Sequence, residues 1–113
     1  MAGNAPDSLR IVELPSEIDI TNCDVVQARL LAAVSDPRLV IADMTNTKFC
    51  DSAGMRMLVA VDEHARANDC VVRFAVTSES SVARVTGILG IDSTLSVYHS
   101  VEEALPPRGA THP

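Results

Sequence analysis

The segment LVIADMTNTKFCDSAGMRML, residues 39–58, is the most informative part of the sequence. It begins with an apolar run, Leu39–Ala42, of the kind that forms a buried strand. Polar residues follow, and Asp51-Ser52-Ala53-Gly54 then opens a second apolar segment with helical spacing. This order predicts a strand, a loop and a helix, with the Ser52 hydroxyl in the first turn of that helix.

Strands and helices are expected to alternate on both sides of this stretch. Before it we predict a strand over residues 9–14 that Pro15 ends, its extension over 17–20, and a helix over 24–35 capped by Thr21-Asn22. After it we predict a helix over 54–67, a strand over 71–76, a helix from 78 to 88 or 89, a strand over 95–98 and a short helix over 100–105 with a capping box. The alternation predicts an α/β fold with a four- to five-stranded mixed sheet and about four helices.

The chain is expected to form one domain over residues 1–113, because no linker, repeat or low-complexity tract divides it. The ordered core should span about residues 9–105, with flexible ends at 1–7 and 106–113. Loops at the carboxyl ends of parallel strands meet at one edge of a sheet and carry function. Here these loops are residues 15–24, 44–54 and 77–81.

The composition argues against several classes of function. A net charge of −6 and only 3% aromatic residues argue against nucleic-acid binding, which needs a basic face or stacking platforms. No apolar run approaches the roughly 18–20 residues that span a bilayer, so we expect a cytoplasmic protein without a membrane partner. Metal-ligand spacings, phosphate-binding loops and nucleophile elbows are also missing, which predicts no metal, no cofactor and no enzyme activity.

The sequence leaves two interpretations of Ser52 open. The structural one is a serine that caps the helix. The functional one is a phosphoacceptor, because a phosphate there would add a charge of about −1.5 to −2. The helix N-terminus would offset part of that charge, while Asp51 would repel it. A phosphate on Ser52 would therefore disrupt a docked partner while leaving the fold in place.

Other residues near Ser52 also have two interpretations. Gly54 either lets a partner or nucleotide approach, or allows a tight junction between loop and helix. Asp19 is an ordinary exposed carboxylate unless its loop lies beside Ser52. The three cysteines fit reduced hydrophobic residues in or near the core, and a redox-sensitive pair of Cys23 and Cys50 is the alternative.

Several segments between about residues 9 and 105 together resemble the STAS domain, and within it the bacterial anti-anti-sigma factors (anti-sigma factor antagonists). The most specific is the D-[ST]-[SA]-G-[LM] core at 51–55, which follows a D-x-[ST]-like turn at 43–45. Glu17-Ile18-Asp19, the glycine-containing element at 87–91 and the segment SVEEAL at 100–105 accompany it. The family usually has an extra N-terminal strand, for which the eight residues before Leu9 leave little room.

This resemblance implies a partner-switching phosphoprotein in transcription regulation. The unphosphorylated protein would bind an anti-sigma factor that is also a serine kinase, and so free a sigma factor. The kinase would phosphorylate Ser52 and end binding, and a phosphatase would restore it. The implied partner-binding residues are Asp19, Thr21, Asp51, Ser52, Gly54 and Met55. We expect a monomer or weak dimer. Two alternatives stay open, namely a STAS scaffold subunit of a signalling assembly and an accessory STAS subunit of a lipid or anion transport system.

Overall fold

The main sheet of the protein has four parallel strands in a computed structural model that describes residues 9–35, 38–77 and 95–106. In spatial order they are β1 (Leu9–Glu13), β3 (Leu39–Asp43), β5 (Val71–Ala75) and β6 (Ser96–Tyr98). The predicted α/β class is confirmed. All strand pairs among the described residues are parallel, so the antiparallel pair expected of a mixed sheet is not found there.

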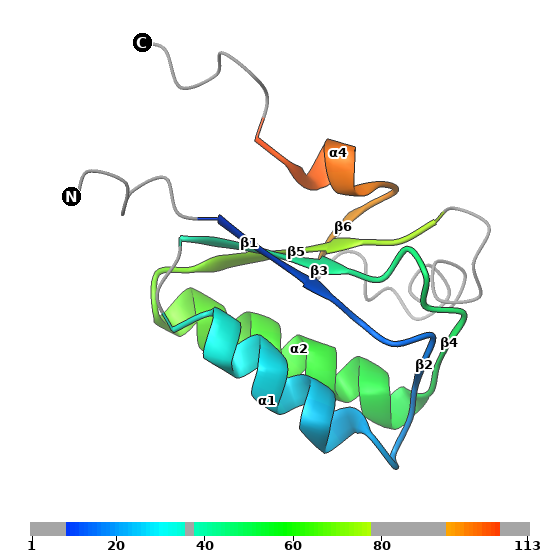
Figure 1. The fold of residues 1–113 in the computed structure, drawn as a ribbon. Coiled ribbons are helices and arrows are strands. Elements are labelled where there is room, and N and C mark those ends of the chain that lie inside the picture. The colour runs from blue at the N-terminus through cyan, green and yellow to red at the C-terminus, as the bar shows by residue number, and fades with distance from the viewer. Residues whose placement is uncertain (1–8, 36–37, 78–94, 107–113) are drawn as a thin grey trace, which may run out of the picture.

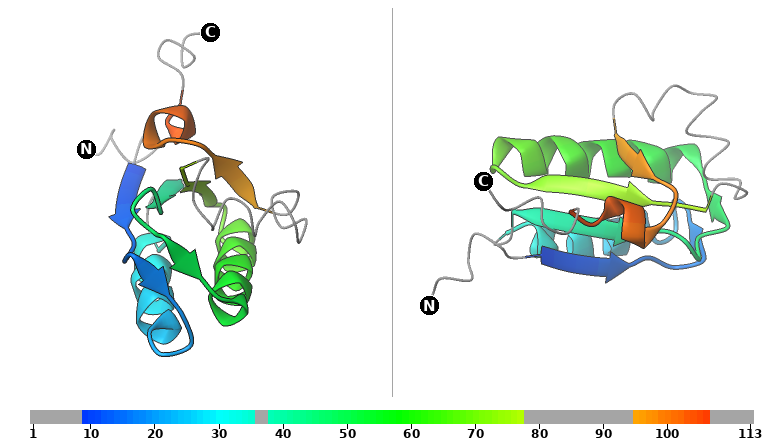
Figure 2. Two further views of the ribbon diagram at one scale, coloured as in Figure 1. Left: turned by 90° about the vertical axis from the view of Figure 1, so that its right-hand side faces the viewer. Right: turned by 90° about the horizontal axis from the view of Figure 1, so that it is seen from above.

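The helices lie on both faces of this sheet. Helices α1 (Cys23–Ala33) and α2 (Ser52–Ala67) pack side by side on one face, and the short α4 (Val101–Ala104) lies on the other (Figures 1 and 2). The helix expected over residues 78–89, most of the loop at 77–81 and most of the expected flexible ends fall outside the described residues.

The strand β3 is buried on both faces because helices cover it from each side. Val40 and Ala42 belong to the large hydrophobic core between the sheet and α1 and α2. Ile41 points the other way and packs with Ala75 and Ala104 in a smaller cluster under α4. This two-sided burial explains why residues 39–42 form a continuous apolar run.

A second, two-stranded sheet stands beside the first and was not expected. Residues 17–20 do not extend the first strand as predicted, because Pro15 and a bend at Ser16 redirect the chain. Instead β2 (Glu17–Ile18) pairs in parallel with β4 (Phe49–Cys50), inside the segment predicted to be a loop.

The predicted helix caps form only in part. The Ser100 hydroxyl accepts a hydrogen bond from the Glu103 backbone N–H at 3.0 Å, as the capping box requires. The Glu103 carboxylate reaches the backbone N–H of His99 at 3.2 Å instead of that of Ser100. Asn22 occupies the N-cap position of α1 but makes no side-chain capping bond there.

Asp62 is a carboxylate buried on α2 with only 2% of its surface exposed. Arg66 Nε lies 3.0 Å from Asp62 Oδ2, yet Oδ2 accepts no hydrogen bond, so the contact is an electrostatic one. Burial raises the pKa of Asp62, and the attraction of Arg66 offsets this only in part. The ionised form is therefore less favourable in the folded protein than in the unfolded chain.

We expect Asp62→Asn to increase the free energy of unfolding by about 1 kcal/mol at pH 7, because it removes a buried charge that is poorly compensated. A pKa that is higher in the folded state means that the penalty is present above that pKa and disappears as pH falls below about 4, where both states are protonated. Urea denaturation at pH 7 and at a pH below about 4 tests this prediction. Glu63→Gln, an exposed neighbour on the same helix, is the control. A gain that stays constant with pH would contradict the charge explanation.

Candidate functional site

The small β2–β4 sheet brings together two loops that are far apart in the sequence. The Ser16 carbonyl accepts hydrogen bonds from the backbone N–H groups of Lys48 and Phe49, at 2.7 and 3.3 Å. Thr47, which is buried, donates its hydroxyl to the Pro15 carbonyl at 2.7 Å. Two of the three loops predicted to meet at the carboxyl ends of the strands therefore do meet (Figure 1).

Asp51 joins these two loops to the first turn of α2. Its Oδ1 accepts a hydrogen bond from the Gly54 N–H at 2.8 Å, which makes Asp51 the N-cap of the helix. Its Oδ2 accepts from the Ile20 N–H at 3.2 Å, and its own N–H donates to the Ile18 carbonyl at 3.0 Å. One side chain thus satisfies backbone donors from two separate segments.

Ser52 is the first residue of α2, and its side chain is exposed. The interpretation of Ser52 as the helix cap is wrong, because Asp51 occupies that position. Within the part of the chain that the structure describes, the Ser52 hydroxyl makes no hydrogen bond. His64 lies twelve residues further along the same helix, about 18 Å away, so it cannot activate this hydroxyl as a base. The hydroxyl is available to another molecule.

The Asp19 loop is held in shape by its own side chains. Asp19 Oδ1 accepts hydrogen bonds from both the hydroxyl and the backbone N–H of Thr21. The hydroxyl bond is the main reason that the pKa of Asp19 lies below its usual value. Asn22 braces the same turn by accepting from the Asp19 N–H and donating to the Glu17 carbonyl, at 2.9 and 2.8 Å. The bond between Ile20 and Asp51 places this turn beside Ser52. This is the arrangement in which we expect Asp19 to be more than an ordinary exposed carboxylate.

Gly54 and Met55 are buried residues of α2, which corrects their expected place on an exposed partner-binding face. Met55 is 2% exposed and belongs to the large core. A Cβ atom on Gly54 would lie 2.7 Å from the Cys50 sulfur and 2.9 Å from Ile18 Cγ2. The group that approaches Gly54 is therefore the chain's own β2–β4 sheet, and the tight-junction interpretation of this glycine is the correct one.

The thiols near Ser52 behave as core residues. Cys50 is buried in the large core, and partly buried Cys23 packs against it; both are free cysteines. Burial first, and then the neighbouring Asp51 and Cys23, raise the pKa of the Cys50 thiol to about 12. A thiol with this pKa forms little thiolate at neutral pH, which argues against a redox-sensitive pair.

Two apolar side chains near Ser52 were not anticipated from the sequence. Ile20 is 73% exposed and Phe49 is 48% exposed, although their buried neighbours Ile18 and Cys50 belong to the core. Phe49 points outward because side chains alternate in β4, whereas Ile20 lies beyond the end of β2 in a turn that exposes it. Neither direction could be predicted from the sequence without predicting those two short strands. We call Asp19, Ile20, Thr21, Phe49, Asp51 and Ser52 together the Ser52 surface.

The described residues contain neither a membrane-spanning helix nor a metal-binding cluster. No described helix is long and apolar enough to cross a membrane. Among residues 9–35, 38–77 and 95–106, no group of three His, Cys, Asp or Glu side chains comes together in an arrangement that could hold a metal ion. The six residues of the Ser52 surface supply two carboxylates, two hydroxyls and two exposed apolar side chains.

Comparison with known proteins gives consistent results. A family model described as the STAS domain matches residues 4–104. The anti-sigma-F factor antagonist RsfB of Mycobacterium tuberculosis is 25% identical over 114 aligned positions, which cover 90% of this chain and 91% of RsfB.

Two solved structures share the fold. The crystal structure of an anti-sigma factor antagonist from Mycobacterium paratuberculosis has a TM-score of 0.74 and 22% identity, covering 83% of this chain and 80% of that one. A sulfate transporter family protein from Wolinella succinogenes has a TM-score of 0.66 and 18% identity, covering 86% and 81%.

We expect Asp51→Ala to lower the free energy of unfolding by about 1–2 kcal/mol, because it removes the α2 cap and the bond to the Ile20 loop. Asp51→Asn should cost less, since its amide oxygen can still accept from the Gly54 N–H. Urea denaturation measures the loss, and hydrogen exchange at the Ile20 and Gly54 amides should become faster in the alanine variant. Equal losses for the two variants would show that the cap bond contributes nothing.

We expect Gly54→Ala to destabilise the protein by about 1–3 kcal/mol, although the same change in a helix normally stabilises it by about 1 kcal/mol. The added methyl group has no room beside Cys50 and Ile18. Introducing Cys50→Ala into the Gly54→Ala variant should recover part of the loss, with Cys50→Ala alone as the control. A Gly54→Ala protein as stable as the wild type would contradict the packing.

Proposed function

The chain belongs to the STAS domain family, and we propose that within this family it acts as an anti-sigma factor antagonist. The observation that carries the proposal is Ser52, an exposed hydroxyl with no hydrogen bond in the described residues, directly after the aspartate that caps α2. The similarity to RsfB over most of both chains supports the same role.

In the proposed mechanism, the unmodified Ser52 surface binds an anti-sigma factor that is also a serine kinase. Binding removes the anti-sigma factor from its sigma factor and so permits transcription. The chain itself contributes no catalytic group and is the substrate of its partner. Exposed Ile20 and Phe49 supply apolar contact area to the complex, and Asp19, Thr21 and Asp51 supply polar contacts around it. Gly54 and Met55 are buried residues of α2 and contribute no exposed contact.

Phosphorylation of Ser52 ends binding through charge. The phosphate adds about −1.5 to −2 charges beside Asp51, whose carboxylate oxygens already accept hydrogen bonds from Gly54 and Ile20. The first turn of α2 holds no acidic residue, so the helix N-terminus can accommodate added negative charge. The fold is therefore retained, while a partner docked on the surface meets a new unpaired charge. A phosphatase then restores the binding form.

The same fold also occurs in a sulfate transporter family protein, which keeps the accessory-subunit alternative in view. That likeness concerns the fold alone, and nothing in the Ser52 surface favours it. The alternatives differ in two measurable ways, because the transport role does not require reversible phosphate on Ser52 and a scaffold subunit belongs to a large assembly. Site-resolved mass spectrometry of the protein purified from its host, with and without stress, tests the first difference, and size-exclusion mass tests the second.

We expect Ser52→Glu to weaken binding of the anti-sigma kinase from the same host by about tenfold or more, while the free energy of unfolding changes by less than about 0.5 kcal/mol. Ser52→Ala should bind within about threefold of the wild type and accept no phosphate from the kinase and ATP. Calorimetric titration and intact mass measure the two effects.

Ser35→Glu is the matched control for this prediction, because it adds the same charge at another exposed serine, which follows the C-terminal end of α1. It should bind like the wild type. A Ser52→Glu protein that binds as tightly as the wild type would contradict the switch, and one that unfolds would contradict the placement of Ser52 in the first turn.

A further inference from the structure

The outer edge of β1 is unpaired among the described residues, where this strand has β3 as its only neighbour. The Leu14 N–H donates to the Asp43 carbonyl at 2.9 Å, which fixes the alternation of backbone groups along the strand. Leu9, Ile11 and Glu13 therefore direct their backbone N–H and C=O groups away from β3. The Glu13 carbonyl confirms this direction, because it accepts a hydrogen bond from Arg29 Nη2 at 2.8 Å.

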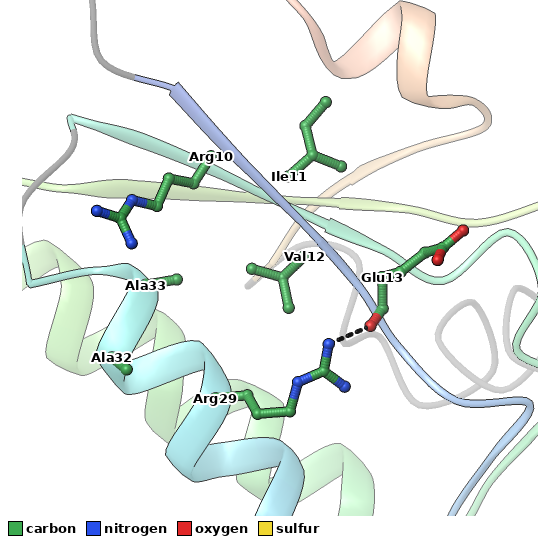
Figure 3. A pocket seen from close by; sticks show the side chains of 7 residues that line it. All are labelled: Arg10, Ile11, Val12, Glu13, Arg29, Ala32 and Ala33. Atoms are coloured by element: carbon green, nitrogen blue, oxygen red, sulfur yellow. Dashed lines mark hydrogen bonds between the residues drawn. The ribbon is translucent and has the colours of Figure 1, made fainter.

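A positively charged groove runs along this edge, between β1 and α1. Its volume is about 480 Å³, and the small side chains of Ala32 and Ala33 form its floor on the helix. Figure 3 shows the guanidinium groups of Arg10 and Arg29 on the helix side of the strand, with the Glu13 carboxylate turned away from Arg29. Arg10 makes no hydrogen bond or ion pair within the described part of the chain.

We propose that this edge and groove bind an extended segment of a partner protein with alternating acidic and apolar residues, which joins the sheet as an additional strand beside β1. The outward N–H and C=O groups of Leu9 and Ile11 supply the ladder hydrogen bonds. Side chains on one side of the added strand then face Arg10 and Arg29, where carboxylates fit. Side chains on its other side face Leu9 and Ile11, which are 38% and 50% exposed.

Charge decides the kind of partner. The chain has a net charge of −6, so most of its surface repels an acidic segment. The two arginines of the groove lie close to the unpaired edge and form a local positive region, which directs such a segment to β1. The inference is independent of the proposed function, because none of the groove residues belongs to the Ser52 surface.

The test is an NMR titration of the full ¹⁵N-labelled chain with short synthetic peptides. A peptide of alternating Glu and Val should shift the amide signals of Leu9, Ile11 and Arg29. The matched peptide of alternating Lys and Val should bind at least about fivefold more weakly. Methylating alternate backbone nitrogens of the Glu peptide should abolish binding, because the ladder bonds are lost.

Charge reversal provides the decisive variant. Arg10→Glu combined with Arg29→Glu should invert the preference, so that the Lys peptide binds more tightly. Arg56→Glu, at an exposed position of α2, should leave the preference unchanged. Equal binding of both peptides, or no shift along β1, would overturn the proposal. The proposal is also overturned if the β1 amide signals of the free chain change with protein concentration, because a second copy of the chain would then occupy the edge. Slow exchange of the Leu9 and Ile11 amides in the free chain, with no response to peptide, would assign the edge to the chain's own residues.

Discussion

The Asp51 carboxylate holds the Ser52 surface together through two hydrogen bonds. One of its oxygens caps α2 at Gly54, and the other holds the Ile20 amide, which lies 31 residues earlier in the chain. Neither segment can shift without losing a bond to this one side chain. Gly54 makes the arrangement possible, because any larger residue would push the helix away from Cys50 and Ile18.

Adjacent residues divide the structural task from the proposed regulatory one. If the serine itself capped the helix, its capping bond would be replaced by bonds to phosphate oxygens on phosphorylation, and the stability of the first turn would change with the switch. Here Asp51 makes the capping bonds, and the Ser52 hydroxyl makes none in the described residues. A reversible charge at Ser52 therefore acts mainly on what docks there, which is the property that a binding switch needs.

The sequence predicts the long elements of the fold well, because α2 has apolar residues at helical spacing and β3 is a short apolar run between turn-forming residues. It fails at β2 and β4, which are two residues each and are stabilised by tertiary contacts such as the bond from Thr47 to Pro15. A two-residue strand has no period to detect.

The same limit explains what was missed at the candidate site. Ile20 lies two residues after the buried Ile18, so strand alternation would assign it to the core, yet the strand ends at Ile18 and the following turn exposes Ile20. Asp51 and Ser52 are both good capping residues, so the pattern could not decide which of them caps. The motif located the candidate site, and only the β2–β4 pairing determined which of its side chains reach the surface.

Helix α1 connects the two surfaces of the protein. It contributes Arg29 to the β1 groove and begins beside the Ser52 surface, but Val26 and Leu30 anchor it in the core. A partner at one surface affects the other only if α1 moves, and such movement would expose those anchors at a cost of roughly 1.5–3 kcal/mol for each side chain. The two surfaces should therefore act independently.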